Sequence, residues 1–324
     1  MKRCLLHANV YDRRRETLKA FADRIQFILF TPEGEFKDAQ SGEVLETPAP
    51  NIVFGSIEAW LGGHGRTFHK AIMEAGELDW FQSAAAGVDN PALSAISAKA
   101  GVYTTNHRQS EPMAEWVIWH ALDWVKRGPE HRANQAAGQW KALDQREIAG
   151  SKWLIVGYGA IGVSVGARVQ AMGGHVTGLK RTARPAENAD IIRPLSELHD
   201  ALGEADIVML SMPHTPETED IANDAFFLAM KDGALFINIG RGKLVDENAL
   251  LAALDSGKPG YAVLDVVREE PLPEGSPLWR HPKITITPHD SPQTQETVYR
   301  GDLTFIENLE RYMAGEELLH IYTP

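Results

Sequence analysis

A glycine-rich turn, Gly157-Tyr158-Gly159-Ala160-Ile161-Gly162, most constrains the fold of this chain, because it joins a short apolar run to a helix-like stretch. In this setting the first glycine permits a tight turn and the second lets the backbone approach a pyrophosphate. The third lets helix and strand pack closely. The amino end of the helix would offer unpaired N–H groups to the phosphates. The GxGxxG spacing alone is weak evidence, but strand, turn and helix together predict a dinucleotide site.

The middle of the chain alternates apolar runs with helix-like stretches. The runs lie at 153–156, 175–179, 206–210, 234–238, 261–264 and 284–287, and the helix-like stretches at 161–172, 195–202, 223–230 and 248–254. Nearly continuous apolar strands that alternate with helices indicate a parallel sheet covered on both faces. We therefore predict an α/β fold whose dinucleotide-binding domain, at 103–286, is a doubly wound parallel-sheet (Rossmann) domain.

The first hundred residues show a weaker form of the same alternation, with a strand expected at 5–10 and a helix at 13–23. Residues 293–313 carry apolar side chains at helical spacing. A helix there could pack back onto the N-terminal part. We therefore expect a smaller, discontinuous, flavodoxin-like α/β domain made of 1–102 and 287–324, which would bind the substrate.

Charge and cysteine content exclude several classes of protein. The chain has 32 basic and 44 acidic side chains, a formal charge of −12, which argues against nucleic-acid or anionic-membrane binding. Cys4 is the one cysteine, so no internal disulfide can form. No apolar run of secretory type follows the first residues and nowhere do 18 apolar residues run together, so we expect a cytoplasmic protein without a leader. His64 and His69 lack a third ligand nearby, so we expect no metal.

The cofactor is predicted from the end of the second strand of the glycine-turn domain. NAD sites usually place a carboxylate there to bind the ribose 2′-hydroxyl. Here the chain reads Leu179-Lys180-Arg181-Thr182, with Arg184 close behind. A cationic segment of this kind suits a 2′-phosphate, so we predict NADP, with NAD as the alternative.

A second motif, GxSxG at 162–166, would suit a hydrolase, and Asp265 and His289 follow in the right chain order. A nucleophile elbow needs its serine on a sharp strand-to-helix turn. Ser164 instead lies inside the helix that the glycine turn begins. We therefore reject the hydrolase reading.

Three segments that follow predicted strands carry charged or titratable residues, where doubly wound sheets bind their ligands. They are Asn238-Ile239-Gly240-Arg241-Gly242, the stretch from Asp265 to Glu270-Pro271, and Thr287-Pro288-His289. Together with the glycine turn they resemble the D-isomer-specific 2-hydroxyacid dehydrogenase family. The segments 78–89, 212–218 and 276–282 also resemble its substrate loop, its cofactor-side loop and its glyoxylate/hydroxypyruvate reductase branch. That branch commonly prefers NADP.

The resemblance implies a role for each matching residue. Arg241 would bind the carboxylate of a small 2-oxo acid, and His289, held in its charged form by Glu270, would protonate the carbonyl oxygen as nicotinamide delivers hydride. The product would be an (R)-2-hydroxy acid. Backbone N–H groups of Ala85, Ala86 and Gly87 would also bind the carboxylate. The further residues implied at the cofactor are Pro213, Thr215 and Asp265, the last at the nicotinamide carboxamide.

Two stretches depart from the family pattern, 106–112 and Asp290-Ser291-Pro292, and both fall where the substrate side chain would lie. Substrate choice therefore stays open, and Arg108 could pair with Asp290 or contact an anionic substrate. The alternatives to 2-oxo acid reduction are oxidation of phosphite or of another 2-hydroxy acid on the same site, and a nicotinamide-sensing binding protein.

Four of the eight tryptophans fall in one short stretch: Trp116, Trp119, Trp124 and Trp140. Tryptophan is enriched at subunit interfaces, although aromatic clusters also fill ordinary cores. We expect a homodimer through the region from Trp116 to Trp140.

Overall fold

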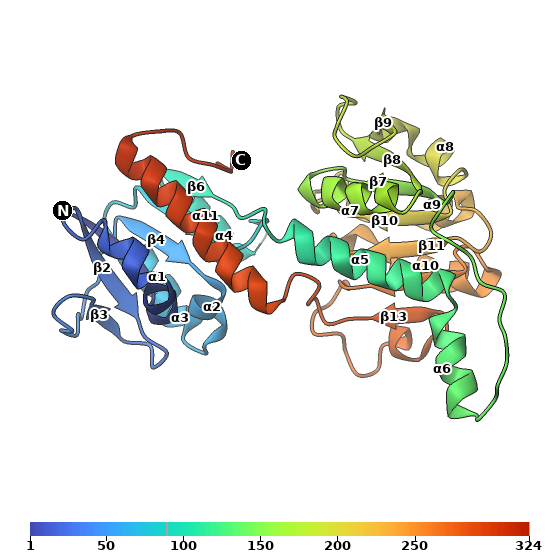
Figure 1. Cartoon of the computed structure of the whole chain (residues 1–324), viewed down its shortest axis with the longest axis horizontal. Coiled ribbons are helices and arrows are strands. Elements are labelled where there is room, and N and C mark those ends of the chain that lie inside the picture. Colours follow the sequence, from blue (N-terminus) through green and yellow to red (C-terminus); the bar gives the residue numbers. More distant parts are fainter. Residues whose placement is uncertain (89, 324) are drawn as a thin grey trace. The chain divides into compact units, whose positions relative to one another are not determined.

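The computed structural model describes residues 1–88 and 90–323, which leaves Asp89 of the predicted substrate loop outside the described residues. The chain divides into two compact units, 1–109 with 294–324 and 110–293 (Figure 1). The sequence placed these boundaries slightly earlier, at 102/103 and 286/287. None of the described helices is long and apolar enough to cross a membrane.

The unit at 110–293 is built on a seven-stranded parallel sheet of order β13-β12-β11-β10-β7-β8-β9 (Figure 1). Its strands are β7 Lys152–Val156, β8 His175–Lys180, β9 Ile191–Pro194, β10 Ile207–Leu210, β11 Leu235–Asn238, β12 Tyr261–Leu264 and β13 Ile284–Ile286. Its helices are α5 Ser110–Val125, α6 Gly128–Ala136, α7 Ala160–Ala171, α8 Leu198–Leu202, α9 Asp224–Ala229 and α10 Glu247–Ser256, with 3₁₀ turns η1 Leu195–Glu197, η2 Gly242–Leu244 and η3 Pro277–Arg280.

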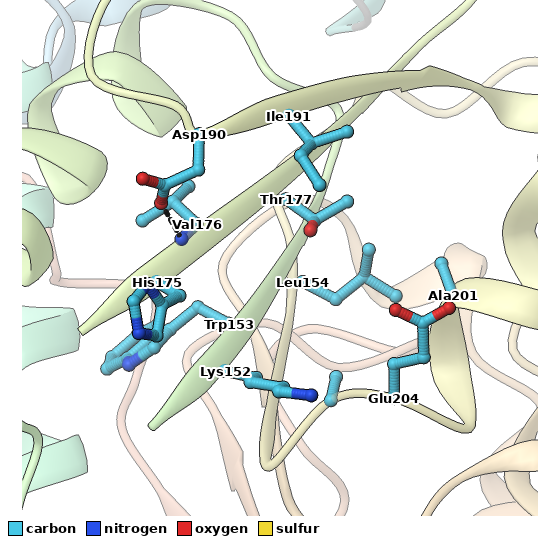
Figure 2. Close-up of a pocket in the computed structure, with 11 residues that line it drawn as sticks. Lys152, Trp153, Leu154, His175, Val176, Thr177, Asp190, Ile191, Ala201 and Glu204 are labelled. Atoms are coloured by element: carbon cyan, nitrogen blue, oxygen red, sulfur yellow. Dashed lines mark hydrogen bonds between the residues drawn. The ribbon is translucent and has the colours of Figure 1, made fainter. Parts of the chain in front are cut away.

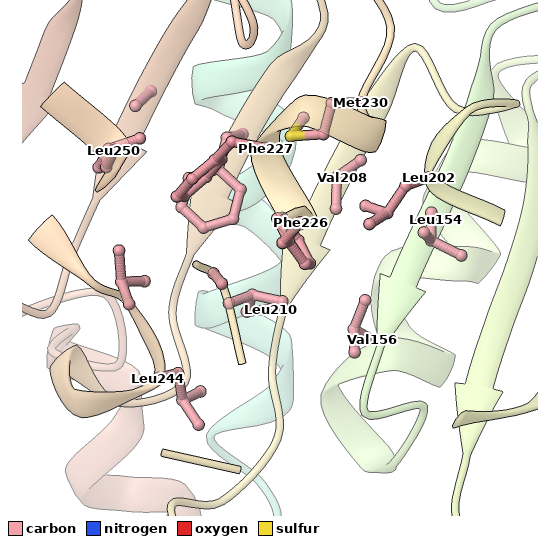
Figure 3. Packing of buried hydrophobic residues seen from close by; sticks show 14 of the residues in the cluster. Leu154, Val156, Leu202, Val208, Leu210, Phe226, Phe227, Met230, Leu244 and Leu250 are labelled. Atoms are coloured by element: carbon pink, nitrogen blue, oxygen red, sulfur yellow. The ribbon is translucent and has the colours of Figure 1, made fainter. Parts of the chain in front are cut away.

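Successive residues of the central strands point into two different cores, which is why their sequences are apolar throughout. In β7 and β10, Leu154, Val156, Val208 and Leu210 pack against α8, α9 and α10 (Figure 3). The alternate residues pack with α5 and α7. Each fully buried Leu or Phe side chain contributes about 1.5–3 kcal/mol relative to exposure. The predicted doubly wound parallel sheet is therefore confirmed.

The other unit has a six-stranded sheet of order β3-β2-β1-β4-β5-β6, parallel except for the edge strand β3. Its strands are β1 Lys2–His7, β2 Ile25–Phe30, β3 Phe36–Asp38, β4 Ile52–Gly55, β5 Trp80–Ser83 and β6 Val102–Thr104. Its helices are α1 Ala8–Lys19, α2 Ile57–Leu61, α3 Gly65–Glu74, α4 Pro91–Lys99 and α11 Gln295–Ala314.

The C-terminal helix α11 completes this unit. Phe305 of α11 is fully buried and stacks on Phe54 of β4, with ring centroids 4.7 Å apart and planes 2° apart. Its neighbour Asp302 is buried and accepts hydrogen bonds from Arg13 of α1. The helix predicted at 293–313 thus lies where the sequence placed it, against the N-terminal part of the chain.

The first strand and helix begin earlier than the sequence predicted. β1 ends at His7 and α1 starts at Ala8, whereas the expected strand was 5–10 and the expected helix 13–23. The cause is a local cap, because the His7 side chain accepts the N–H of Asn9 and so starts the helix. Apolar Val10 then faces the core from the helix rather than from a strand.

Candidate active site

The glycine turn between β7 and α7 has a conformation that requires glycine at its first position. Gly157 adopts φ +92°, and a Cβ there would lie 2.6–2.7 Å from Met212. Gly162 packs against Ile155 and Tyr158, so a side chain there would separate helix from strand. Gly159 is exposed, and a Cβ on it would meet nothing within 4 Å. The backbone at Gly159 is therefore open to approach by a ligand.

The first N–H groups of α7 point out of the helix without partners in it. Among the described residues, the N–H groups of Ala160, Ile161 and Gly162 have no hydrogen-bond acceptor, as expected for the first turn of a helix. Ala160 is exposed and Ile161 is half-buried. These donors and the open backbone at Gly159 form a cradle that suits a phosphate group.

Tyr158 has a structural role and is not part of this phosphate cradle. Its side chain is buried, and its hydroxyl donates to the carbonyl oxygens of Glu187 and Asn188 at 2.9 and 2.5 Å. Its backbone N–H donates to Leu179. Burial raises the pKa of the phenol to about 12. Because both donors are already bonded, the predicted cofactor contact of Tyr158 is not supported by its conformation.

A cationic segment begins at the last residue of β8. Lys180 is half-buried, and Arg181, Thr182 and Arg184 are exposed. In the described part of the chain none of the three cations forms an ion pair. Arg181 lies close enough to the 213–218 loop to act on Glu217. The pKa of Glu217 is lowered mainly by a hydrogen bond with Thr215 and, to a smaller extent, by Arg181.

The 213–218 loop, which contains the predicted cofactor residues Pro213 and Thr215, is shaped by one buried hydroxyl. The Oγ1 atom of Thr218 accepts the N–H of Thr215 at 2.7 Å and donates to the carbonyl of Pro213 at 3.0 Å. Pro213 is exposed and Thr215 half-buried. The loop follows β10, next to the strand that leads into the glycine turn.

Arg241, Glu270 and His289 follow three strands that are neighbours in the sheet: β11, β12 and β13. Parallel strands bring their carboxyl ends to one edge, which is where open α/β sheets bind ligands. The Nδ1 atom of His289 lies 2.8 Å from Glu270 Oε2. Both side chains are partly exposed, 45% and 38%. With Nδ1 bonded to the carboxylate, Nε2 is the ring nitrogen that can exchange a proton with a substrate.

The Arg241 loop is fixed by buried contacts. The side chain of Asn238, fully buried, accepts the N–H of Gly240 and donates to the carbonyl of Arg241, both at 3.0 Å. One guanidinium nitrogen of Arg241 donates to Gly240 O at 2.7 Å. A Cβ on Gly242 would lie 1.9 Å from the carbonyl of Val267. The Arg241 loop therefore packs directly on the segment that leads to Glu270.

Asp265 organises the histidine loop, a role that the sequence did not reveal. The side chain is 1% exposed, and Oδ1 accepts the Thr287 hydroxyl at 2.6 Å and the N–H of Asp290 at 3.0 Å. Both carboxylate oxygens also lie within 3.3 Å of the Ser291 N–H. Between these anchors His289 adopts φ +55°. The predicted contact with nicotinamide stays a prediction, while the loop contacts are direct.

The predicted substrate loop follows β5 in the other unit. The N–H of Ala85 donates to Ser83 Oγ at 3.0 Å, so this donor is not open to a carboxylate, contrary to the prediction. The N–H groups of Ala86 and Gly87 have no acceptor within the described residues. Arg108 pairs with Glu307 of α11 at 3.1 Å, within the same unit.

The structure also places the serine of the GxSxG motif. Ser164 is buried within α7, and its hydroxyl bonds to Glu111 and Arg168, so it is no nucleophile elbow. Within 1–88 and 90–323, no cluster of three or more His, Cys, Asp or Glu side chains could hold a metal ion.

A hollow of about 220 Å³ lies by the first residues of β7, β8 and β9 (Figure 2). Lys152, His175, Asp190 and Glu204 are among its lining residues. The strands begin at this edge of the sheet, and the predicted site residues follow the opposite ends of the strands. None of the predicted site residues lines it.

Comparison with known proteins shows the family to which the chain belongs. Residues 118–291 match the family model of the D-isomer specific 2-hydroxyacid dehydrogenase NAD binding domain. This chain belongs to that family. It is a family of oxidoreductases, so the domain at 110–293 is a nicotinamide dinucleotide-binding domain.

Two solved structures match this chain over nearly its whole length, and a third matches over part of it. A family protein from Aeromonas salmonicida is 27% identical, with a TM-score of 0.80 and 99% of each chain covered. A D-isomer specific 2-hydroxyacid dehydrogenase from Xanthobacter autotrophicus, in complex with NADPH and MES, is also 27% identical, with a TM-score of 0.78 over 100% of this chain and 98% of that one. An NADPH-dependent glyoxylate/hydroxypyruvate reductase from Sinorhizobium meliloti is 32% identical, with a TM-score of 0.55 over 58% of this chain and 96% of that one.

Proposed function

We propose that this enzyme reduces a small 2-oxo acid, of the glyoxylate or hydroxypyruvate kind, to the (R)-2-hydroxy acid. The observation that carries the proposal is the 2.8 Å hydrogen bond between His289 Nδ1 and Glu270 Oε2. These residues follow β13 and β12, and β12 is the neighbour of β11, the strand that leads to Arg241. A bound nicotinamide supplies the hydride. The protein supplies position, charge and a proton.

His289 and Arg241 act on the carbonyl oxygen. Reduction places negative charge on that oxygen, so a protonated imidazole and a guanidinium interact with it more strongly in the transition state than in the ground state. Glu270 holds Nδ1 by a hydrogen bond, which leaves Nε2–H to donate. The guanidinium of Arg241 binds the substrate carboxylate.

NADPH is the cofactor that the residues favour. The cradle at Gly159 and the first N–H groups of α7 fit a pyrophosphate, because the backbone there is exposed and its donors lack acceptors in the described chain. Lys180 ends β8 and Arg181 follows it, where a 2′-phosphate would lie, and residues 180–184 include no carboxylate for a 2′-hydroxyl. The two relatives described as using or binding NADPH support the same choice.

An absorbance assay tests the proposal. The purified protein is mixed with NADPH or NADH and with glyoxylate, hydroxypyruvate or a bulkier 2-oxo acid, and oxidation is followed. We expect turnover with a small 2-oxo acid and preference for NADPH. Absence of turnover with every 2-oxo acid would overturn the proposal. Phosphite with NADP serves as the contrasting substrate, and binding of NADPH without turnover would favour a sensing role.

The role of Arg241 has a direct test within the same assay. Loss of one donor to a developing oxyanion costs about 3 kcal/mol, so Arg241→Ala should lower kcat/KM more than a hundredfold. Arg193→Ala is the matched control, because Arg193 forms an ion pair with Glu204 in the same domain. Near-normal kcat/KM of Arg241→Ala on every good substrate would remove the assignment.

We also propose that the chain forms a homodimer through the region from Trp116 to Trp140. Trp116 and Trp124 pack into the core, but Trp119 is 59% exposed and Trp140 is fully exposed. Helix α6 between them has no buried residue. Light scattering of Trp119→Ser/Trp140→Ser should then show a monomer, whereas Trp279→Ser, which alters an exposed tryptophan elsewhere, should not. A monomeric wild-type chain would overturn the dimer proposal.

The lone thiol of Cys4 is buried, which suits the cytoplasmic location that we infer.

A further inference from the structure

The loop between Asp265 and Glu270 carries an arginine that no part of the proposed chemistry uses. Arg268 pairs with Asp220 through one guanidinium nitrogen and lies 3.6 Å from Glu219 through the other. The same group approaches the carbonyl oxygen of Val245 at 3.3 Å. Arg268 therefore ties the loop that bears Glu270 to two other segments of the domain.

The backbone of Arg268 is anchored as well. Its N–H donates to Glu247 Oε1 at 2.7 Å, at the start of α10. The preceding residue, Val267, presses its carbonyl against Gly242 of the Arg241 loop and donates its N–H to Glu270 Oε1 at 3.2 Å. The carboxylate that bonds His289 is thus held by the peptide next to Arg268.

The partners of Arg268 lead to the 213–218 loop. Glu219 lies 3.5 Å from His214 of that loop, and the next residue, Asp220, adopts φ +52°. Two adjacent carboxylates repel each other, and the guanidinium between them and the Glu270 loop offsets that repulsion. Removing the guanidinium would free both ends of the contact: the turn at 219–220 and the segment at 267–270.

We propose that Arg268 is a positioning residue, which holds the Glu270 loop, the Arg241 loop and the 213–218 loop in one arrangement. The inference rests on the proposed function for its kinetic consequences. Its structural content is separate: without Arg268 the Glu270 carboxylate no longer stays on His289. Lysine is a poor substitute, because a single ammonium cannot present two nitrogens to two carboxylates in a fixed fork.

The test compares Arg268→Met and Arg268→Lys with Arg193→Met. Arg193 is the matched control, since its guanidinium bonds both oxygens of Glu204 at 3.2 Å and touches none of the three loops. For each protein the thermal midpoint, kcat, the KM for the 2-oxo acid and the dissociation constant of NADPH are measured. We expect Arg268→Met to lower kcat by about ten- to a hundredfold, the range that small misplacements of catalytic groups produce, and to weaken NADPH binding. Arg193→Met should lower only the thermal midpoint.

A second readout needs no turnover. In protein labelled with ¹⁵N at histidine, the Nδ1 signal of His289 is assigned by its loss in His289→Gln. Its chemical shift, which reports the hydrogen bond to Glu270, is compared among the variants at one pH. We expect the Nδ1 shift of Arg268→Met to move toward that of Glu270→Gln, with Arg268→Lys in between. A shift identical to wild type, with unchanged kcat, would overturn the proposal even if stability fell. If wild type reduces no 2-oxo acid, the proposed function fails, while the Nδ1 shift still decides the role of Arg268.

Discussion

The buried carboxylate of Asp265 accepts the backbone N–H of Ser291, two residues beyond His289, at 3.2 Å. The carbonyl of the same aspartate accepts the N–H of His289 itself at 2.8 Å. One residue at the end of β12 thus holds the loop after β13 from both sides. The position of His289 therefore depends on β12, the strand beside its own, as well as on β13.

Replacing Asp265 by Asn should impair catalysis and folding together. The amide cannot accept from Thr287, Asp290 and Ser291 as the carboxylate does, and a buried donor left unsatisfied costs about 1–3 kcal/mol. We expect the free energy of unfolding to fall by that amount and kcat to fall more than tenfold, because the histidine loop loses its anchor.

The control for this change is Asp206→Asn. Asp206 also accepts a backbone N–H, from Lys152 at 2.9 Å, and pairs with Lys231, just before β10 and far along the strands from the site residues. Chemical denaturation and steady-state kinetics should show a stability loss without a loss of kcat. If both variants lose activity in proportion to stability, Asp265 has no special role in the loop.

Replacing Arg181 by Ser should change the choice of cofactor. A charge-assisted hydrogen bond contributes about 1.5–3 kcal/mol, so the KM for NADPH should rise about tenfold or more. The KM for NADH should change little, because its ribose carries no 2′-phosphate. Parallel titrations with both cofactors measure this. An equal effect on both would place Arg181 away from the 2′-phosphate.

Sequence patterns predicted the doubly wound sheet because its strands are buried on both faces, which makes an apolar run unmistakable. The edge strands β3 and β9 are short and partly exposed, so they carry no comparable pattern. The strand Ile191–Pro194 even ends in proline, which suits an edge but not a central strand.

The site was predictable only in part, for a similar reason. Residue types and family resemblance indicate Arg241, Glu270 and His289, since each follows a strand. The contacts that hold these three residues in place come from residues such as Asp265 and Arg268, whose anchoring roles no sequence pattern indicates. For Tyr158 the sequence misleads in the other direction. It lies within the glycine motif, yet its hydroxyl bonds to the backbone carbonyl oxygens of Glu187 and Asn188 and so has a structural role.

Replacing Gly157 by Ala should be more destabilising than the same change at Gly233. Both residues have positive φ, +92° and +67°, so both variants carry the backbone strain of an L-residue, about 1 kcal/mol. Only at Gly157 would the new Cβ also meet Met212, at 2.6–2.7 Å, and backbone atoms there cannot move aside. Denaturant titrations of the two variants measure the difference. Equal losses would mean that the turn relaxes without cost.

Stability should fall in mild acid because of His120 in α5. Its side chain is 5% exposed, it packs between Trp116 and Trp119 with ring centroids 4.2 Å away, and burial lowers its pKa to about 4. In the unfolded chain the ring of His120 takes up a proton near pH 6.5, whereas in the folded chain it does so only near pH 4. The contribution of neutral His120 to the free energy of unfolding is therefore complete above pH 6.5 and is lost as the pH falls toward 4.

The variant His120→Met removes this titration and keeps an apolar side chain in the same place. Between pH 7 and pH 5, wild type should lose about 2 kcal/mol more unfolding free energy than the variant, as the linkage of the two states to protons requires. Denaturant unfolding at both pH values and at one fixed protein concentration measures the difference, since any association would otherwise add to it. Parallel losses in the two proteins would show that His120 titrates alike in the folded and unfolded chains, and that its place between the two tryptophans does not exclude the proton.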